Sequence, residues 1–287
     1  WLGLIVFAVA MAGMVATVLV GAEVKGATRW IRIFGFSVQP SEFMKPALCI
    51  LMASLFASRR EGYRMPGDAL ATMLYLLVAL FLVWQKDIGQ TFLVTVIWAV
   101  QAFLVGLPLI AALVLVMVGL IALVVGYFTL DHVQSRINRF LDPQSGDTYQ
   151  IERALDAFRS GGLTGVGPGE GSIKAKIPDG HADFILAVGA EEYGAVLCVL
   201  ILGLFALMMV FATIRTIRMN HLFAMLASAG LIVQVALQSL INAASTIHLI
   251  PTKGMTLPMI SYGGSSLIAI GITLGALLAI TRRKTGG

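Results

Sequence analysis

Long apolar runs recur along the whole sequence and constrain its fold more than any other feature. A helix needs about 20 apolar residues to cross a bilayer, and runs of about that length appear repeatedly. Hydrophobic residues make up 58% of the chain and charged residues only 12%, about half of the charged fraction of soluble domains. The sequence therefore predicts an all-α fold, a polytopic bundle of membrane helices.

We predict eight spans in a single membrane domain over residues 1–287. They cover residues 2–22, 43–58, 67–84, 88–106, 108–130, 185–213, 221–246 and 259–281. A long loop over 131–184 separates the fifth span from the sixth. Trp1 lies inside an apolar run with no basic segment before it, which does not fit a signal peptide. We therefore expect the sequence to be a fragment of a longer membrane protein.

Basic residues set the predicted orientation, because cytoplasmic loops of membrane proteins are enriched in Lys and Arg. With the start of the first span inside, three basic clusters face the cytoplasm, at 59–64, 215–218 and 282–284. The segments that then face outward are 22–42, 85–90, 131–184 and 247–258. Cations in these outer segments favour an anionic ligand there, and pairing with acids such as Glu42 or Asp87 is the alternative.

Charge and cysteine usage exclude other classes of protein. The net charge of +5 could indicate a protein that binds nucleic acid. In a membrane protein, however, such a charge follows from the enrichment of Lys and Arg in cytoplasmic loops and from their attraction to anionic lipids. We expect membrane lipids and no nucleic acid as partners. Cys49 and Cys198 lie inside apolar runs and predict neither a disulfide framework nor a metal site. The four histidines are scattered without the spacing of metal ligands.

The extracytoplasmic loop over 131–184 is long enough that a function is expected of it. Residues 149–159 predict a short amphipathic helix, and a glycine-rich run follows from Gly161 to Gly171. Backbone N–H groups of such a run can hold phosphate. No predicted strand precedes the run and no helix follows it directly, so a flexible loop is favoured over a phosphate site.

Three carboxylates lie at the start of the sixth predicted span. Asp183 comes just before the apolar run, where it could cap the helix or act as a general base at the membrane surface. Glu191 and Glu192 lie inside the run. Carboxylates within a membrane helix are functional by default, and a buried pair with a cation or hydroxyl of a neighbouring helix is the alternative.

Polar residues also interrupt the last two spans. Gln234, Gln238 and Asn242 share one helical stripe, which predicts interhelical hydrogen bonds or the wall of a polar cavity. Two prolines in 249–258 and the Ser-Tyr-Gly-Gly-Ser-Ser segment at 261–266 predict irregular backbone that delays the last helix. At membrane depth such backbone is tolerated only where it lines protein or a water-filled cavity.

Six segments form an ordered set of motifs. They are 26–31 (GATRWI), 39–46 (QPSEFMKP), 85–89 (QKDIG), 181–184 (HADF), 251–258 (PTKGMTLP) and 260–266 (ISYGGSS). Together they resemble the SEDS family of shape, elongation, division and sporulation proteins, and 251–258 is similar to the cell-division branch, FtsW, rather than to RodA. Lys86 replaces a proline of the family pattern, and Ala182 a threonine. The family has ten spans, so the resemblance implies that two are missing before the first one here.

This resemblance implies a peptidoglycan glycosyltransferase that polymerises lipid II in the septum during cell division. The 4-hydroxyl of an acceptor GlcNAc would attack the anomeric carbon of a donor MurNAc, and undecaprenyl pyrophosphate would leave. Asp183 matches the family's essential aspartate, which favours the general base over the helix cap. The implied setting is the bacterial inner membrane, with the site facing the periplasm and a class B penicillin-binding protein transpeptidase and other divisome proteins as partners.

The expected site surrounds Asp183 with cations and polar residues. The residues expected to bind the lipid II pyrophosphate are Arg29, Lys45, Arg153, Lys174 and Lys253. The supporting residues are Glu42, Asp87, His181, Glu191, Glu192, Gln238, Asn242, Ser261, Tyr262, Gly263, Gly264 and Ser265. A divalent cation, Mg²⁺ or Mn²⁺, could assist. The alternative functions are a lipid II flippase, which needs no base, and a non-catalytic divisome scaffold, which needs neither the base nor the outer cations.

Overall fold

A computed structural model describes residues 2–20, 22–24, 27–33, 36–106, 109–129, 131–141, 149–251 and 254–282. The chain forms two compact units. The first unit consists of Trp1–Leu107, Met208–Leu237 and Gly263–Gly287, and the second of Pro108–Leu207 and Gln238–Tyr262.

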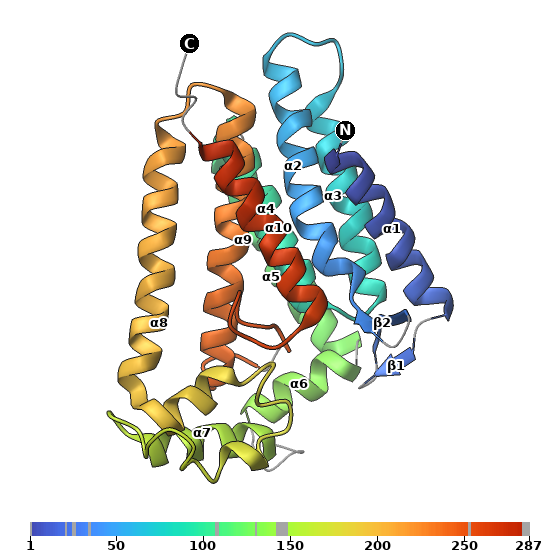
Figure 1. Ribbon diagram of the computed structural model, residues 1–287. Helices are drawn as coiled ribbons and strands as arrows, with labels where there is room; N and C mark the ends of the chain where they lie inside the picture. Colours follow the sequence, from blue (N-terminus) through green and yellow to red (C-terminus); the bar gives the residue numbers. More distant parts are fainter. Residues whose placement is uncertain are drawn as a thin grey trace. The chain divides into compact units, whose positions relative to one another are not determined.

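Helices make up most of the structure, as predicted (Figure 1). The first unit holds α1 (Leu2–Val20), α2 (Pro40–Arg60), α3 (Gly67–Trp84), α4 (Ile88–Val105) and α10 (Gly264–Thr281). The second unit holds α5 (Leu109–Thr129), α6 (Asp131–Leu141), α7 (Tyr149–Gly161) and the short 3-10 helix η2 (Lys174–Lys176). The sequences of α8 (Ile185–Ile217) and α9 (Leu222–Thr246) are divided between the units.

Seven helices of the described chain are long and apolar enough to cross a membrane, namely α1, α2, α3, α4, α8, α9 and α10. They coincide with seven of the eight predicted spans. The remaining prediction, 108–130, coincides with α5, in which Met117–Thr129 is a shorter apolar stretch. The total number of spans therefore stays a prediction.

Two helices begin a few residues away from the predicted starts of their spans. α2 begins at Pro40 rather than at 43, because proline fits the first turn of a helix, where its missing N–H costs nothing. α10 begins at Gly264 rather than at 259, because residues 258–263 form turns and extended backbone. The irregular backbone predicted before the last helix is thus confirmed.

A three-stranded antiparallel sheet lies between α1 and α2 in the sequence, an element that the all-α prediction did not include. Its strands are β1 (Ala22–Val24), β2 (Ala27–Ile33) and β3 (Phe36–Val38), in that order. β2 contains Thr, Trp and two Ile among its seven residues, and β-branched and aromatic side chains favour strands.

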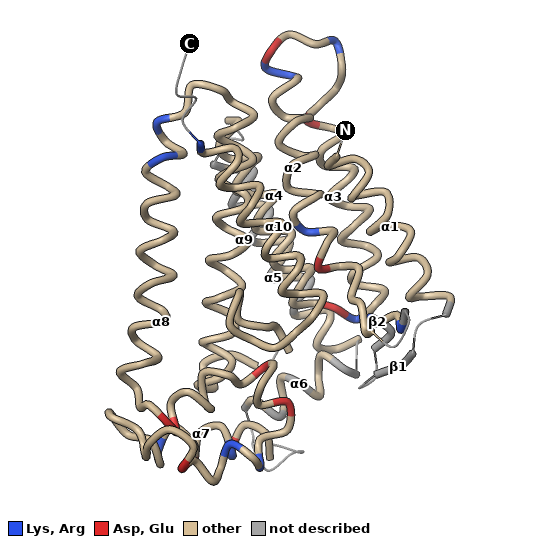
Figure 2. Tube along the Cα trace, in the orientation of Figure 1, with Lys and Arg blue, Asp and Glu red and all other residues tan. Residues whose placement is uncertain are grey.

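Basic residues gather at one end of the first unit. Figure 2 shows Lys and Arg at the α2–α3 turn, at the α8–α9 turn and at the end of α10, the three places predicted to face the cytoplasm. The sheet and the α3–α4 turn lie at the opposite end of this unit (Figure 1). This arrangement agrees with an orientation in which the α3–α4 turn faces outward.

In the second unit the long loop packs against the start of α8. Ala154 and Ala157 of α7 form a buried apolar cluster with Ile177, Phe184 and Ala187. The cluster joins α7 to the first turn of α8, so it fixes the backbone of the turn that precedes α8.

Candidate active site

Asp183 lies in the turn that leads into α8. Its backbone N–H donates to the carbonyl oxygen of Asp179 (3.0 Å). Because α8 begins at Ile185, the position directly before the helix belongs to Phe184 and not to Asp183. Asp183 thus lies one residue before the cap position, and its role as a base stays a prediction.

Asn242 of α9 joins this turn to the segment that follows α9. Its Nδ2 donates to the backbone carbonyl oxygens of Asp183 (3.0 Å) and Met255 (2.7 Å). A methyl group added to Gly254 would lie 3.4 Å from Oδ2 of Asp183. The backbone after α9 thus runs alongside the carboxylate.

The polar stripe of α9 is buried; Gln234 forms an interhelical hydrogen bond, as one of its two interpretations predicted, whereas Gln238 and Asn242 donate to non-helical backbone. Nε2 of Gln238 donates to the carbonyl oxygen of Thr256 (3.1 Å) in the second unit. Nε2 of Gln234 donates to Oγ1 of Thr273 (3.2 Å) in the first unit. Together with Asn242, these residues connect α9 to the polypeptide that follows it.

His181 and Tyr262 form an exposed aromatic pair beside the Asp183 turn. The backbone N–H of Tyr262 donates to the carbonyl oxygen of His181 (2.9 Å), and their rings meet edge to face with centroids 5.5 Å apart. Ser261 is buried, and its Oγ accepts the backbone N–H of Leu257 (2.8 Å). The second unit therefore brings the HADF motif into contact with the SYGGSS motif.

Residues 263–265 of the SYGGSS motif belong to the first unit. Gly263 has extended backbone and α10 begins at Gly264. Oγ of Ser265 accepts the backbone N–H of Gln39 (3.3 Å), the residue before α2. These residues therefore secure the start of α10 against the start of α2.

Glu191 is 1% exposed, and backbone N–H groups of the long loop hydrogen-bond its carboxylate. Its two carboxylate oxygens accept the N–H groups of Ile173 (2.8 Å) and Lys174 (2.6 Å). Hydrogen bonds to a charged carboxylate are about twice as strong as neutral ones. The partner is thus the backbone of the long loop, and the predicted cation or hydroxyl of a neighbouring helix is wrong for this residue.

Glu192 forms an ion pair with Lys174, one of the cations predicted to bind pyrophosphate. Its Oε1 contacts Nζ of Lys174 and also accepts the backbone N–H of Gly169 (3.2 Å). The hydrogen bond to Glu192 is the main cause of a raised pKa at Lys174. Lys174 thus has an acidic partner within the protein, and its role at the pyrophosphate stays a prediction.

The glycine-rich run packs closely against α8, so the expectation of a flexible loop is wrong. Gly165 and Gly194 have φ angles of 82° and 77°. A methyl group on either would lie 2.1 Å from a backbone carbonyl oxygen of the other segment. Backbone hydrogen bonds join residues 162–167 to residues 191–196 on both sides of a kink in α8 at Gly194.

In the first unit, Arg29 of β2 binds the α3–α4 turn. Its Nε donates to the carbonyl oxygen of Gln85 (3.3 Å) and lies 3.5 Å from Oδ2 of Asp87, and its Nη2 donates to the carbonyl oxygen of Lys86. Asp87 is buried and caps α4 by accepting the N–H of Gln90 (3.3 Å). Burial raises the pKa of Asp87, and the positive charge of Arg29 opposes this shift.

A buried ion pair lies within α2. Nζ of Lys45 is 2.8 Å from Oε2 of Glu42, and the two side chains are only 1% and 5% exposed. Gln90 of α4 donates to the other oxygen of Glu42 (2.7 Å). Arg29 and Lys45 are therefore both paired with acids, as the alternative explanation for the outer cations expected. Breaking such a buried pair costs about 3–5 kcal/mol.

The other predicted ligands are placed as follows. Arg153 of α7 pairs with Asp156 (3.1 Å) and lies over the ring of Tyr149 (5.3 Å). Lys253 lies outside the described residues. Within the described part of the chain, no group of three or more His, Cys, Asp or Glu side chains is arranged to hold a metal ion. A role for Mg²⁺ or Mn²⁺ stays a prediction.

Sequence reasoning missed three glutamines of the first unit. Gln85 donates to Oγ1 of Thr17 in α1 (2.6 Å), and Gln90 joins the ion pair of α2. Gln101 donates to backbone carbonyl oxygens of α2 (3.0 Å) and α9 (3.1 Å). Gln90 and Gln101 lie three turns apart on one face of α4, a signal comparable to the stripe that was recognised on α9.

Comparison with known proteins supports the motif-based expectation. Residues 2–286 match the family described as "Cell cycle protein", the FtsW/RodA/SpoVE family. The chain belongs to this family. This is the SEDS family that the motifs indicated, so the expected family is confirmed. The chain is an integral membrane protein.

SEDS relatives match along most of their length. The chain is 46% identical to the probable peptidoglycan glycosyltransferase FtsW of Caulobacter vibrioides, covering 96% of this chain and 71% of the relative. It is 35% identical to a Geobacter sulfurreducens protein of the same name, covering 93% and 73% of the two chains.

Solved SEDS structures share the fold. One is a chain of a peptidoglycan synthase complex described as coordinating polymerization and crosslinking, with 28% identity, a TM-score of 0.79 and coverage of 99% of this chain and 82% of that one. Another is RodA of Thermus thermophilus, with 27% identity, a TM-score of 0.69 and coverage of 100% and 79%.

This chain departs from the SEDS motif pattern at Lys86. The φ angle of Lys86 is 58°, and its N–H donates to the carbonyl oxygen of Val83 (2.9 Å). Proline permits neither, because its ring fixes φ at about −65° and it has no N–H. The α3–α4 turn is therefore built for a residue other than proline, and it presents its carbonyl oxygen to Arg29.

Proposed function

We propose that this SEDS protein polymerises lipid II into glycan strands, with Asp183 as the general base. The 4-hydroxyl oxygen of an acceptor GlcNAc forms a bond to the anomeric carbon of a donor MurNAc. The bond from that carbon to the pyrophosphate oxygen breaks, and undecaprenyl pyrophosphate leaves with the electron pair. The hydroxyl proton passes to the Asp183 carboxylate, because a neutral hydroxyl is a poor nucleophile.

The observation that carries this proposal is the approach of the PTKGMTLP segment to Asp183. Asn242 hydrogen-bonds both backbones, and Gly254 lies next to the carboxylate. Lys253 directly precedes Gly254 in the sequence. A base for the attacking hydroxyl and a cation for the developing pyrophosphate charge are the two groups that this transfer requires. The names of the curated relatives support the same reaction.

The proposed setting is the bacterial inner membrane at the division septum, with the site on the periplasmic side. The FtsW names of the relatives support a role in division. The similarity to a chain of a polymerizing and crosslinking complex supports a crosslinking partner, which we propose to be a class B penicillin-binding protein.

The test compares Asp183→Asn with Asp179→Asn in the presence of the cognate transpeptidase. Both substitutions make the same chemical change in the same turn, and Asp179 is exposed with φ of 55°, which asparagine tolerates. Asn242 bonds the backbone carbonyl of Asp183, so Asp183→Asn leaves that contact in place. We expect Asp183→Asn to lower glycan synthesis from lipid II by about 10²–10⁴-fold, and Asp179→Asn to leave it near normal.

The outcomes separate the candidate functions. Glycan synthesis at the normal rate by well-folded Asp183→Asn would refute the base assignment. Transport of labelled lipid II across vesicles without polymerisation would instead indicate a flippase. If neither activity is found although the transpeptidase is bound, the protein is a scaffold.

A further inference from the structure

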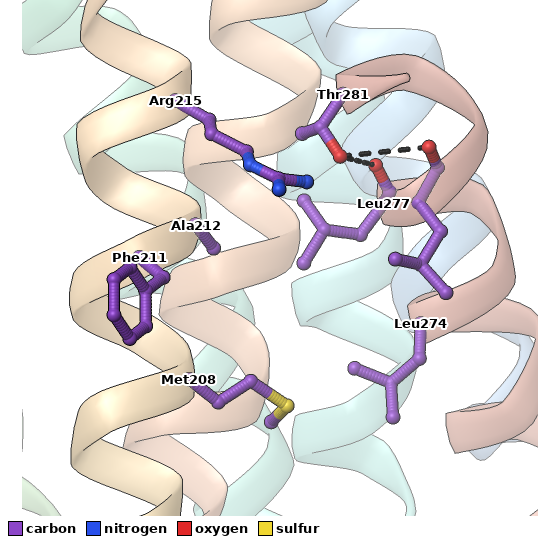
Figure 3. A pocket seen from close by; sticks show the side chains of 8 residues that line it. Met208, Phe211, Ala212, Arg215, Leu274, Leu277 and Thr281 are labelled. Atoms are coloured by element: carbon purple, nitrogen blue, oxygen red, sulfur yellow. Dashed lines mark hydrogen bonds between the residues drawn. The ribbon is translucent and has the colours of Figure 1, made fainter. Parts of the chain in front are cut away.

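A cavity of about 510 Å³ lies between the C-terminal halves of α8 and α10, within the first unit. Its wall is mainly apolar and includes Met208 and Phe211 of α8 and Leu274 and Leu277 of α10 (Figure 3). Arg215 and Thr281 are the polar residues that line it. Cavities of about 300–1,000 Å³ are typical of small-molecule sites.

The apolar part of this cavity calls for a hydrocarbon occupant. Both helices are long and apolar enough to cross a membrane, so their C-terminal halves lie where lipid chains are available. Water is a poor occupant because apolar cavities stay dry, and the hydroxyl of Thr281 already donates to the carbonyl oxygen of Leu277 (2.8 Å). Empty space would forfeit the dispersion contacts of every lining side chain.

Arg215 gives the cavity a positive charge at one end. Figure 3 shows its side chain extending from α8 toward Thr281 of α10. Arg215 is exposed and forms no ion pair with any described residue. The sequence contains no Asp or Glu after Glu192, so the end of α8, α9 and α10 contribute no acid to it. A guanidinium group matches the geometry of phosphate and can bind it with two hydrogen bonds.

The position of Arg215 assigns a leaflet to the occupant. Arg215 belongs to one of the three basic clusters that lie at the same end of the first unit and are predicted to be cytoplasmic. We propose that this cavity binds one anionic phospholipid of the cytoplasmic leaflet, with an acyl chain between α8 and α10 and the phosphate at Arg215. The proposal concerns neither lipid II nor Asp183, and it stands independently of the polymerase activity.

A transmembrane helix of a partner protein is the competing occupant. An apolar helix seated on the cavity would cover Arg215 without supplying an anion, and burying an unpaired charge is costly. A phospholipid fills the apolar wall and neutralises the guanidinium at the same time, so the charge favours the lipid.

Native mass spectrometry of the intact protein tests the charge recognition. The protein is released from nanodiscs that contain equal amounts of phosphatidylglycerol and phosphatidylcholine of the same chain length. We expect about fivefold more bound phosphatidylglycerol than phosphatidylcholine, the preference of one basic residue near a membrane surface. Arg215→Gln should abolish the preference and Arg215→Lys should keep part of it. The matched control is Arg218→Gln, which removes the same charge from an exposed position outside the cavity and should change little.

A second pair of variants tests the cavity itself. Ala212→Leu adds bulk to the wall, whereas Ala206→Leu makes the same change at an exposed position of α8 outside the cavity. We expect the first to reduce binding of both lipids several-fold and the second to leave binding unchanged. Equal binding of the two lipids, or equal effects of Arg215→Gln and Arg218→Gln, would overturn phosphate recognition at Arg215. Equal binding by the two leucine variants would overturn the cavity as the site. Displacement of the lipid by a purified partner helix would overturn the lipid as its occupant.

Discussion

The side-chain amide of Asn242 donates a hydrogen bond of 3.0 Å to the backbone carbonyl oxygen of Asp183. The same nitrogen donates to Met255 at 2.7 Å. One buried side chain of α9 therefore holds two segments that are far apart in the sequence, the turn before α8 and the PTKGMTLP segment. If Asp183 is the base, Asn242 is a positioning residue for it.

We therefore expect Asn242→Leu to lower glycan synthesis by about 10²-fold, because small misplacements of catalytic groups have effects of that size. Gln234→Leu is the matched control, since Gln234 lies on the same stripe and bonds Thr273 rather than the Asp183 turn. It should cost about 0.6 kcal/mol of stability with turnover near normal. Steady-state assays with lipid II, beside melting curves, separate the two effects. Equal losses of turnover in both variants would remove the positioning role.

Gly194→Ala should detach the glycine-rich run from the kink in α8. The added methyl group would lie 2.1 Å from the carbonyl oxygen of Leu163, and φ of Gly194 is 77°. Gly203→Ala is the control on the same helix, because nothing lies within 4 Å of its added methyl group. Hydrogen exchange of residues 162–176 should accelerate in the first variant only. Unchanged protection in Gly194→Ala would mean that the run is held by other contacts.

Gly230→Ala should destabilise the first unit. Its methyl group would lie 2.4 Å from Sγ of Cys49 and 2.5 Å from Nε2 of Gln101, where Gln101 links α4 to α2 and α9. Overpacking of this kind costs about 1–3 kcal/mol. Gly271→Ala in α10 meets nothing within 4 Å and should have little effect. Thermal unfolding in detergent provides the comparison, and similar midpoints for the two variants would contradict the close contact.

The pair between Lys174 and Glu192 should make stability depend on alkaline pH. Glu192 raises the pKa of Lys174 above its ordinary value of 10.5, so the folded state holds this proton more tightly than the unfolded state does. The contribution of the ion pair to the free energy of unfolding is fully present below pH 10.5. It is lost as the pH rises through the raised pKa of Lys174. Lys174→Gln should lower the melting temperature below pH 10.5 and remove this alkaline loss. Lys176→Gln, an exposed change in the same 3-10 helix, should do neither.

The membrane helices and the α9 stripe could be predicted because their signals are local. Apolar length marks a span, and Gln234, Gln238 and Asn242 repeat with the helical period, so their burial follows from the sequence. The motifs likewise identified the family. The short sheet was missed although β2 contains strand-favouring residues, because strands of three to seven residues do not stand out beside the long apolar runs.

The surroundings of Glu191 could not be predicted for a different reason. Its partners are two backbone N–H groups contributed by residues 173 and 174. Backbone donors carry no sequence signature, so reasoning from side chains sought a cation or hydroxyl instead. The glycine-rich run posed the same problem, because its contacts with α8 join one backbone to another.

The backbone anchoring of Glu191 also affects how this part of the protein can change during evolution. Every amino acid except proline supplies the N–H that Glu191 needs, so substitutions at positions 173 and 174 leave this particular contact in place. Selection on this contact therefore falls on the acid alone. Comparison of related sequences should show an invariant carboxylate at 191 with no covarying partner, although the loop stays bound to α8.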